Sequence, residues 1–168
     1  RQRWYPVKAA AVTRVTLAEH AVLQGPCRGS QEWLLALADV QGTASSARYF
    51  VPLAVAYDDD DEERTRTLAA VAVSKVRQQA KMGVLADAMA DEPFCRALVQ
   101  AIKSGQVLKG EGGSVHFTPG HACAELVGDA LQGPAVLHRL AMSSNSATLL
   151  GDRLFLKAYR CVQPGRCP

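Results

Sequence analysis

The sequence predicts an α+β fold in which one main helix packs on an antiparallel β-sheet. Three apolar runs separated by short turn segments occupy the first third of the chain, and an amphipathic segment follows near its middle. The connections between the three runs are too short for crossover helices, so consecutive strands should pair antiparallel. Two further apolar runs joined at Gly151-Asp152 add a β-hairpin near the C-terminus.

The first three strands are expected where apolar and β-branched residues cluster. The first covers Lys8 to Leu23, the second Glu32 to Val40 and the third Arg48 to Tyr57. Because proline has no backbone N–H, Pro52 predicts that the third strand is bulged or lies at a sheet edge.

Six consecutive acidic residues, Asp58 to Glu63, follow the third strand. A calcium loop needs carboxylates at alternating positions around a glycine turn, which this run lacks. We interpret the run as a solvated loop. The next segment, Leu68 to Val76, has the composition of a strand, with an Ala-rich helix as the alternative.

The main helix is expected to begin at Asp91, a residue type that favours the N-cap position. Pro93 falls in the first turn, and Gly105 ends the helix. Phe94, Leu98 and Ile102 recur every four residues, so they share one face that should cover the sheet. Leu85 to Met89, just upstream, is interpreted as the approach to this helix or as an extra turn.

The second half of the chain has weaker signals before the hairpin. A glycine-rich loop at Gly110 to Gly113 precedes a short strand, Ser114 to Thr118, and a short helix is expected over Ala122 to Leu131. Gly133-Pro134 is the clearest boundary. The hairpin then consists of Ala147 to Leu150 and Arg153 to Tyr159, joined by a two-residue turn.

Composition places the chain among globular proteins and excludes several classes. Of its 168 residues 48% are hydrophobic, and 19 Lys and Arg against 16 Asp and Glu give a net charge of +3. The basic residues are dispersed, so we expect no nucleic-acid partner. No apolar run approaches the roughly 20 residues of a spanning helix, and no signal peptide is evident. We therefore expect a soluble cytoplasmic protein without a membrane partner.

Motifs for metal, phosphate or nucleophilic chemistry are mostly missing. The sequence has no GxxxxGK[ST], no GxGxxG after a strand and no GxSxG. Gly110 to Gly113 and Lys75 stand in the wrong order for a kinase glycine loop and its lysine strand. His116, His121 and Cys123 lack a fourth zinc ligand at a recognised spacing, so we expect no metal site. The five cysteines share no disulfide or zinc spacing and are expected as free thiols.

The C-terminal hairpin is the best candidate for a binding site. Side chains alternate along a strand, so Lys157 should share a face with Phe155 and Tyr159. The small polar residues before the hairpin, Ser144 to Ser146, can offer N–H groups and hydroxyls to phosphate oxygens, and Lys157 can reach the same phosphate. The alternative is that Lys157 is an edge-strand lysine that discourages aggregation.

The segment from Ser143 to Pro168 resembles the start of the kinase part of bacterial maltokinases, including those fused to trehalose synthase. In that family a Ser-Asn-Ser/Thr loop, a Gly-Asp-Arg turn and a Leu-Lys strand precede an Arg-rich stretch with Pro-Gly and a later Pro. The matching residues are Ser144, Asn145, Ser146, Gly151, Asp152, Arg153, Leu156, Lys157, Tyr159, Arg160, Pro164, Gly165 and Pro168.

Two other segments resemble the same family, its Arg-Trp-aromatic start and its Gly-x-Leu-x-Asp-Ala segment leading into a helix. The matching residues are Arg3, Trp4, Tyr5, Lys8, Gly83, Leu85, Asp87, Ala88, Asp91, Pro93, Phe94 and Leu98. The chain departs from the family pattern at two places. Pro6 and Val7 replace glycines, and Met142-Ser143 replaces a Glu-Gln.

The resemblance implies ATP-dependent phosphorylation of the anomeric hydroxyl of maltose, with ATP and Mg²⁺ as cofactors of the whole enzyme. It implies a distantly cystatin-like cap over 1–135 and the first strands of a kinase-like lobe over 136–168. Lys157 would contact the nucleotide phosphates, with Ser144, Asn145 and Ser146 in the loop above them. No residue of this chain is implied to be catalytic or to bind metal.

The resemblance also predicts the partners of the chain. The Mg²⁺ ligand and the Asp that orients the attacking hydroxyl lie in the larger lobe of kinase-like folds. Since the sequence ends at Pro168, we expect no kinase activity from the chain alone and expect the kinase-like C-terminal lobe as its partner. An uncovered hairpin would favour a homodimer. The alternative function is a non-catalytic docking module for a partner such as trehalose synthase.

Overall fold

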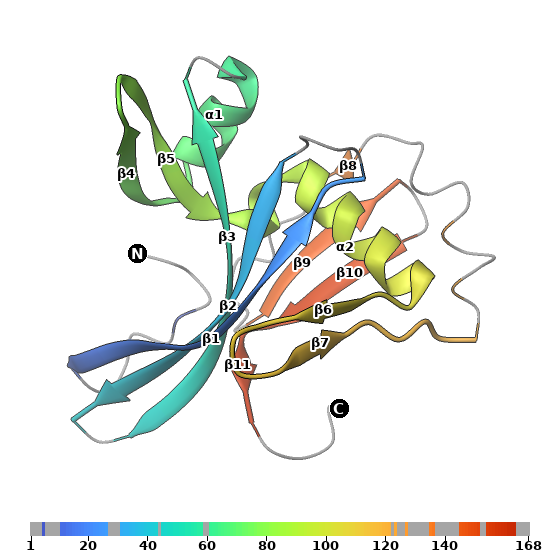
Figure 1. The fold of residues 1–168 in the computed structure, drawn as a ribbon, viewed down its shortest axis with the longest axis horizontal. Helices are drawn as coiled ribbons and strands as arrows, with labels where there is room; N and C mark the ends of the chain where they lie inside the picture. The colour runs from blue at the N-terminus through green and yellow to red at the C-terminus, as the bar shows by residue number, and fades with distance from the viewer. Residues whose placement is uncertain are drawn as a thin grey trace.

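The largest element of the molecule is an antiparallel sheet with strand order β1-β2-β3-β5-β4, to which β11 adds beside β3 (Figure 1). The computed structural model describes residues 5, 11–26, 31–43, 45–58, 61–121, 123, 127, 135–136, 145–151 and 154–163. The sheet consists of β1 (Val12–Gln24), β2 (Glu32–Gly42), β3 (Ser46–Tyr57), β4 (Ala72–Gln78), β5 (Lys81–Asp87) and β11 (Cys161–Val162). With mostly antiparallel strands and two described α-helices, the α+β prediction is confirmed.

The first three strands form the predicted meander. Trp33 of β2 lies opposite Leu23 of β1 and Ala54 of β3, and all three side chains are buried. Residues that pair across antiparallel strands point to the same face, so this row belongs to the core. The apolar runs therefore identified both the strands and their pairing.

The position of Pro52 corrects the prediction for β3, which is an interior strand. β3 pairs with β2 along most of its length, and Pro52 lies opposite Leu35. On its other side, β3 pairs with β11 at residues 48–49 and with β5 from residue 53 onward. The N–H of Phe50 points to that side, toward the Arg160 carbonyl, and so would an N–H at position 52. Pro52 is accommodated because it falls between the two partner strands.

The acidic run corrects a second prediction, because a helix begins inside it. α1 (Glu62–Ala69) has Asp61 as its N-cap, and the Asp61 carboxylate accepts a hydrogen bond from the Arg64 N–H at 2.9 Å. Acidic residues in a first helical turn also interact favourably with the helix dipole. The helix alternative is right up to Ala69, and the predicted strand begins only at Ala72.

The segment before the main helix was also misinterpreted, since most of it is β5. Gly83 lies so close to β3 that a Cβ there would sit 2.2 Å from the Ala56 carbonyl oxygen. A single 3-10 turn, η1 (Ala88–Ala90), follows β5, and the Asp87 carboxylate caps it by accepting from the Met89 N–H at 3.0 Å. A turn was one of the two interpretations given for this segment, but the strand was missed.

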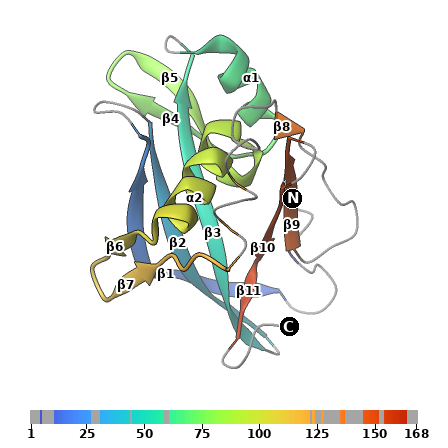
Figure 2. The ribbon, with the colours of Figure 1, turned by 90° about the vertical axis from the view of Figure 1, so that its right-hand side faces the viewer.

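The main helix, α2 (Glu92–Ser104), is where the sequence predicted it. Asp91 is at the N-cap position, and Gly105 ends the helix with a φ of 64°. More of α2 is buried than the single predicted face, including Cys95 and Val99. The reason is visible in Figure 2, where α2 lies between the large sheet and the hairpin of β9 and β10. Both sides of the helix therefore contact other elements.

The remaining strands form two small sheets. β6 (Val107–Lys109) pairs with β7 (Ser114–His116), and β9 (Asn145–Leu150) pairs with β10 (Leu154–Tyr159) and with β8 (Ala135–Val136). The predicted hairpin is confirmed, but Leu150 pairs with Leu154, so its connection has three residues instead of two. The helix expected over Ala122 to Leu131 falls largely outside the described residues.

None of the helices in the described ranges is long and apolar enough to cross a membrane.

Candidate functional site

Lys157 lies on the outer face of the β9–β10 hairpin, as its alternation with Leu156 and Ala158 predicted. Its ammonium nitrogen is 4.5 Å from the centroid of the Tyr159 ring, which is a cation–π contact. Phe155, on the same face, is 56% exposed. The outer face thus presents a solvent-accessible cation between two aromatic side chains.

The structure brings Asn145 to this face and directs Ser146 to the other one. Asn145 lies opposite Tyr159, and Ser146 lies opposite the buried Ala158. Paired residues point to the same side, so Ser146 faces inward. Both residues belong to β9 rather than to a loop. Ser144, the fourth candidate, lies outside the described residues.

Arg160 joins the inner face of the hairpin to the large sheet. Its side chain is fully buried, and its Nη2 donates to both carboxylate oxygens of Asp87 at 2.8 and 2.6 Å. Its Nε donates to the Ser146 hydroxyl at 2.8 Å, and its carbonyl accepts from the Phe50 N–H at 2.7 Å. We call Arg160, Asp87, Ser146 and Phe50 the hairpin junction.

The hairpin junction was missed as a unit, although a signal for part of it exists. The alternation that turns Lys157 outward turns Arg160 inward, together with Ala158. An arginine on an apolar inner face needs a carboxylate partner, because an isolated buried charge is strongly unfavourable. That partner is 73 residues away in the sequence, at the end of β5, and only the folded chain identifies it.

A second buried ionic group, the cap junction, is centred on Asp91. The Asp91 carboxylate accepts from the Trp33 indole N–H at 2.7 Å and from Arg64 at 3.0 and 2.7 Å. Arg64 also donates to the Val55 carbonyl at 3.2 Å. These bonds explain why the Asp91 side chain makes no capping bond to α2. They connect α1, β2, β3 and the start of α2.

Cys95 lies in the contact between α2 and the hairpin. Its Sγ is 3.9 Å from the Thr148 hydroxyl and 3.8 Å from the Met89 carbonyl, and the residue is fully buried. Burial raises the pKa of this thiol from 9.0 to about 12. Only the thiolate form of cysteine is a good nucleophile, and the raised pKa disfavours that form. Cys95 is therefore an unreactive packing residue while the hairpin packs against α2.

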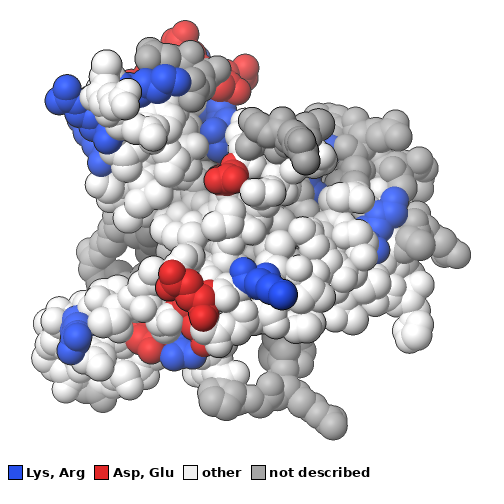
Figure 3. Space-filling view, in the orientation of Figure 1, with Lys and Arg blue, Asp and Glu red and all other residues white. Residues whose placement is uncertain are grey.

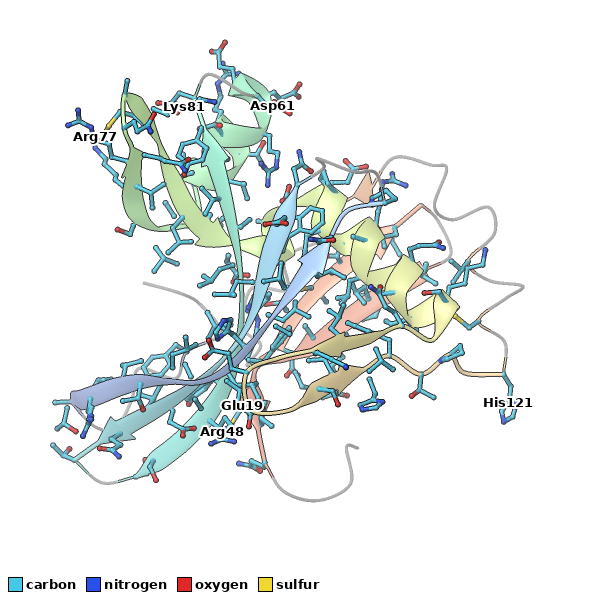
Figure 4. All side chains as sticks on the ribbon, in the orientation of Figure 1. Glu19, Arg48, Asp61, Arg77, Lys81 and His121 are labelled. Atoms are coloured by element: carbon cyan, nitrogen blue, oxygen red, sulfur yellow. The ribbon has the colours of Figure 1, made fainter. Side chains whose placement is uncertain are left out.

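In the part of the chain that the structure describes, residue types that bind metal ions are not assembled into a site. The described residues hold no group of three or more His, Cys, Asp and Glu with metal-binding geometry. In the trio considered from the sequence, His116 Nε2 lies 2.8 Å from the Ser114 hydroxyl, and His121 is exposed and directed away from the body (Figure 4). On the face in Figure 3, basic side chains are scattered among acidic ones instead of forming one patch.

The fit of the hairpin to a nucleotide is partial. Its described residues offer the Lys157 ammonium and the Asn145 amide on one face, which suit phosphate oxygens. The same residues include no carboxylate, the ligand that Mg²⁺ requires. The described hairpin residues therefore resemble one side of a phosphate site, without a ligand for Mg²⁺ among them.

Comparison with protein families gives one match. Residues 1–91 match the family model described as the Maltokinase N-terminal cap domain. The matched range runs from the N-terminus through β5 and η1 and ends at Asp91. No curated protein matches the chain. Asp87 and the whole cap junction lie within the matched range, whereas α2 and the hairpin come after it.

Proposed function

The chain belongs to the maltokinase N-terminal cap domain family, and we propose that it forms the cap and the first hairpin of an ATP-dependent maltokinase. Such an enzyme transfers the γ-phosphoryl group of ATP to the anomeric hydroxyl of maltose and yields maltose 1-phosphate. The proposal places it in the cytoplasm, where ATP is available, in trehalose and α-glucan metabolism.

The hairpin junction is the observation that carries this proposal. Arg160 is three residues from Lys157 and is bound to Asp87 of the matched cap region. A buried arginine that donates from Nη2 to a carboxylate and from Nε to a hydroxyl has little freedom to move. The cap therefore supports the strand that carries Lys157, as it would have to if the two parts act together in one enzyme.

ATP supplies the transferable phosphoryl group when it is bound, and the residues of the chain have separate roles. We assign Lys157 and Asn145 to contacts with the phosphates, because they share the outer face. Ser144 is assigned to the same contacts on the family resemblance. Ser146 was grouped with them, but its hydroxyl accepts from Arg160, so its role would be to orient β9.

The proposal divides the chain into a cap over 1–135 and the start of a kinase-like lobe over 136–168. The contacts that cross this boundary include the pairing of β11 with β3, the hairpin junction and the contact of Cys95 with Thr148. Phosphoryl transfer also needs carboxylates to hold Mg²⁺ and to orient the attacking hydroxyl. The proposal assigns these to a kinase-like C-terminal lobe, with which this chain would associate, and treats the chain alone as inactive.

The experiment compares lysine variants in an enzyme that contains this chain and its kinase-like lobe. Lys157→Ala should lower kcat/KM for ATP by at least roughly tenfold, because it removes a phosphate contact. Lys81→Ala is the matched control, since Lys81 also lies over a tyrosine ring, 6.0 Å from the Tyr57 centroid. An unchanged rate for Lys157→Ala contradicts the site. Maltose 1-phosphate formed by the 168-residue chain alone contradicts its assignment as an inactive part.

A docking module for a partner such as trehalose synthase is the second candidate function. The observation that favours it is the projecting unit of α1, β4 and β5 (Figure 1), where Val73 is 56% and Met82 46% exposed. Arg77 and Lys81 lie at its tip (Figure 4). Isothermal titration of the chain with trehalose synthase tests this role. Binding that Met82→Glu abolishes supports it, and absence of binding contradicts it.

A further inference from the structure

Lys157 has a long, flexible side chain, and its cross-strand neighbour does little to fix its position. Lys157 pairs with Ala147, whose methyl group offers neither bulk nor a polar atom to hold the ammonium. The ammonium instead lies 4.5 Å from the centroid of the Tyr159 ring, two residues further along β10. A cation at this distance is attracted to the ring face through the ring quadrupole. The Tyr159 ring therefore draws the Lys157 ammonium toward one end of the outer face of the hairpin.

Tyr159 is attached to a strongly held part of the hairpin. The next residue, Arg160, is fully buried and donates hydrogen bonds to Asp87 and Ser146. The Arg160 carbonyl also accepts from the Phe50 N–H at 2.7 Å, which fixes the backbone immediately after Tyr159. A tyrosine side chain has only two rotatable side-chain torsions, whereas a lysine ammonium is carried on a flexible four-carbon stem. The position of the ring is therefore better defined than that of the ammonium it attracts.

The Tyr159 ring also lies beside the second residue assigned to phosphate contacts. Asn145 is directly opposite Tyr159 in the β9–β10 register, so both side chains point to the outer face. The Cβ atoms of such a pair are about 5 Å apart. Asn145 is in turn adjacent to Ser146, which accepts a hydrogen bond from Arg160. An ammonium drawn to the Tyr159 ring is thus brought to the same end of the face as the Asn145 amide.

We propose that Tyr159 is a positioning residue that holds the Lys157 ammonium beside Asn145, so that both groups meet the phosphates of a bound nucleotide. The inference rests on the proposed nucleotide function of the hairpin and adds to it a residue that acts through Lys157. An ammonium has three N–H donors, and those that point away from the ring can donate to phosphate oxygens. Holding the lysine in place beforehand lowers the cost of ordering it when the nucleotide binds.

Steady-state kinetics of an enzyme that contains this chain and its kinase-like lobe test the inference. Tyr159→Leu removes the aromatic face and should raise KM for ATP by roughly three- to fivefold, while kcat and KM for maltose stay unchanged. Tyr159→Phe keeps an aromatic face and should stay within about twofold of the wild type. Tyr57→Leu is the matched control and should change none of these constants, because Tyr57 contacts Lys81, 6.0 Å from its ring centroid, and not Lys157. Circular dichroism verifies that each variant is folded.

A double variant separates positioning from a structural effect. In the Lys157→Met background, which has no ammonium, Tyr159→Leu should cause no additional rise in KM for ATP. An additional rise there overturns the inference, and so does a lowered KM in Tyr159→Leu alone. A wild-type KM in Tyr159→Leu overturns the inference alone, provided that Lys157→Met still raises KM for ATP. If Lys157→Met has no effect, the nucleotide site and the inference fail together.

Proton NMR of the 168-residue chain gives a second readout, which does not depend on activity. The ring current of Tyr159 should shift the signal of the Lys157 methylene group next to the ammonium upfield, because that group approaches the ring face. Tyr159→Phe should keep this shift, and Tyr159→Leu should return the signal to the position of an exposed lysine. A wild-type signal already at that position overturns the inference.

Discussion

The cap junction and the hairpin junction solve the same electrostatic problem in two parts of the molecule. Each buries an arginine against an aspartate, Arg64 with Asp91 and Arg160 with Asp87. The first pair is 27 residues apart and lies within the region that matches the cap family, whereas the second is 73 residues apart and connects that region to the hairpin. The cap junction therefore holds elements of the cap together, and the hairpin junction positions the β9–β10 hairpin on the cap.

Both junctions are fully hydrogen-bonded, which is what makes a buried ion pair tolerable. Among the described residues, no buried side-chain nitrogen or oxygen lacks a hydrogen-bond partner. Removing one member of such a pair leaves an uncompensated charge and is far more costly than replacing both members. Variants at the two junctions should therefore have large effects of different kinds.

Asp91→Ala should have the largest effect and should destabilise the cap as a whole. It removes the acceptor of the Trp33 indole and leaves Arg64 without its carboxylate. The expected loss is about 3–5 kcal/mol of unfolding free energy. Urea denaturation, followed by tryptophan fluorescence, measures it. Asp91→Asn keeps an acceptor oxygen and should lose less; equal stability of wild type and Asp91→Ala would contradict the importance of this junction.

Arg160→Met should have the next largest effect, concentrated in the hairpin. It keeps most of the buried volume but removes the bonds to Asp87 and Ser146, with an expected loss of about 2–3 kcal/mol. Hydrogen exchange should accelerate in residues 145–162 and change little in β1 and β2.

A second substitution checks the cause of the Arg160→Met effect. Asp87→Asn, added to Arg160→Met, removes the unpaired charge while keeping an acceptor for the Met89 N–H, and should recover part of the stability. Uniform acceleration of hydrogen exchange across the whole sheet would show that the stabilising effect of the hairpin junction is not confined to the hairpin.

Cys95 can report separation of the hairpin from α2. In a variant whose other four cysteines are replaced by serine, thiol labelling at neutral pH should be slow, because burial raises the pKa of Cys95 to about 12. Arg160→Met should accelerate labelling by roughly tenfold, by exposing the contact with Thr148. A labelling rate that Arg160→Met leaves unchanged would contradict this link.

The raised pKa of Cys95 also has a consequence for stability. The pKa of Cys95 in the folded state lies above its value in the unfolded state. The contribution of the buried thiol to the free energy of unfolding is therefore fully present below about pH 9 and is lost as the pH rises toward 12.

The exposed pair of Arg48 and Asp39 should show the smallest effect. The Arg48 guanidinium donates two hydrogen bonds to Asp39, and these bonds lower the pKa of Asp39 below its usual value. Arg48→Ala should return that pKa toward 3.8 in an NMR titration, without a measurable change in the midpoint of urea unfolding at neutral pH. Because the folded pKa is lowered, the stabilisation by this pair is present at neutral pH and disappears as the pH falls through that pKa. A large loss of stability in Arg48→Ala would remove the distinction between buried and exposed pairs.

The elements that were predicted well are those that local chemistry defines. The meander follows from apolar runs with short connections, and α2 follows from its four-residue repeat between Asp91 and Gly105. The errors occur where a local signal has two interpretations. Glu62 and Glu63 belong equally well to a solvated loop and to the first turn of a helix, and the cap at Asp61 decides between them.

The predictions for the candidate site were likewise correct where strand alternation applies and wrong where it was not applied. Alternation predicted correctly that Lys157 and Phe155 share a face, because neighbouring side chains on a strand point in opposite directions. It did not predict that Ser146 faces inward, because the residue was placed in a loop, where no alternation applies.

The fold class, the main strands and helix, and the outward direction of Lys157 could all be predicted from the sequence, since they depend on periodicity between residues a few positions apart. Three arrangements required the folded chain: Asp87 as the partner of Arg160, Asp91 bound to Trp33 and Arg64 instead of capping α2, and Pro52 between two partner strands. A buried charge or a missing N–H shows that a compensating arrangement is needed. The identity of that arrangement depends on which distant segments the closed chain brings together.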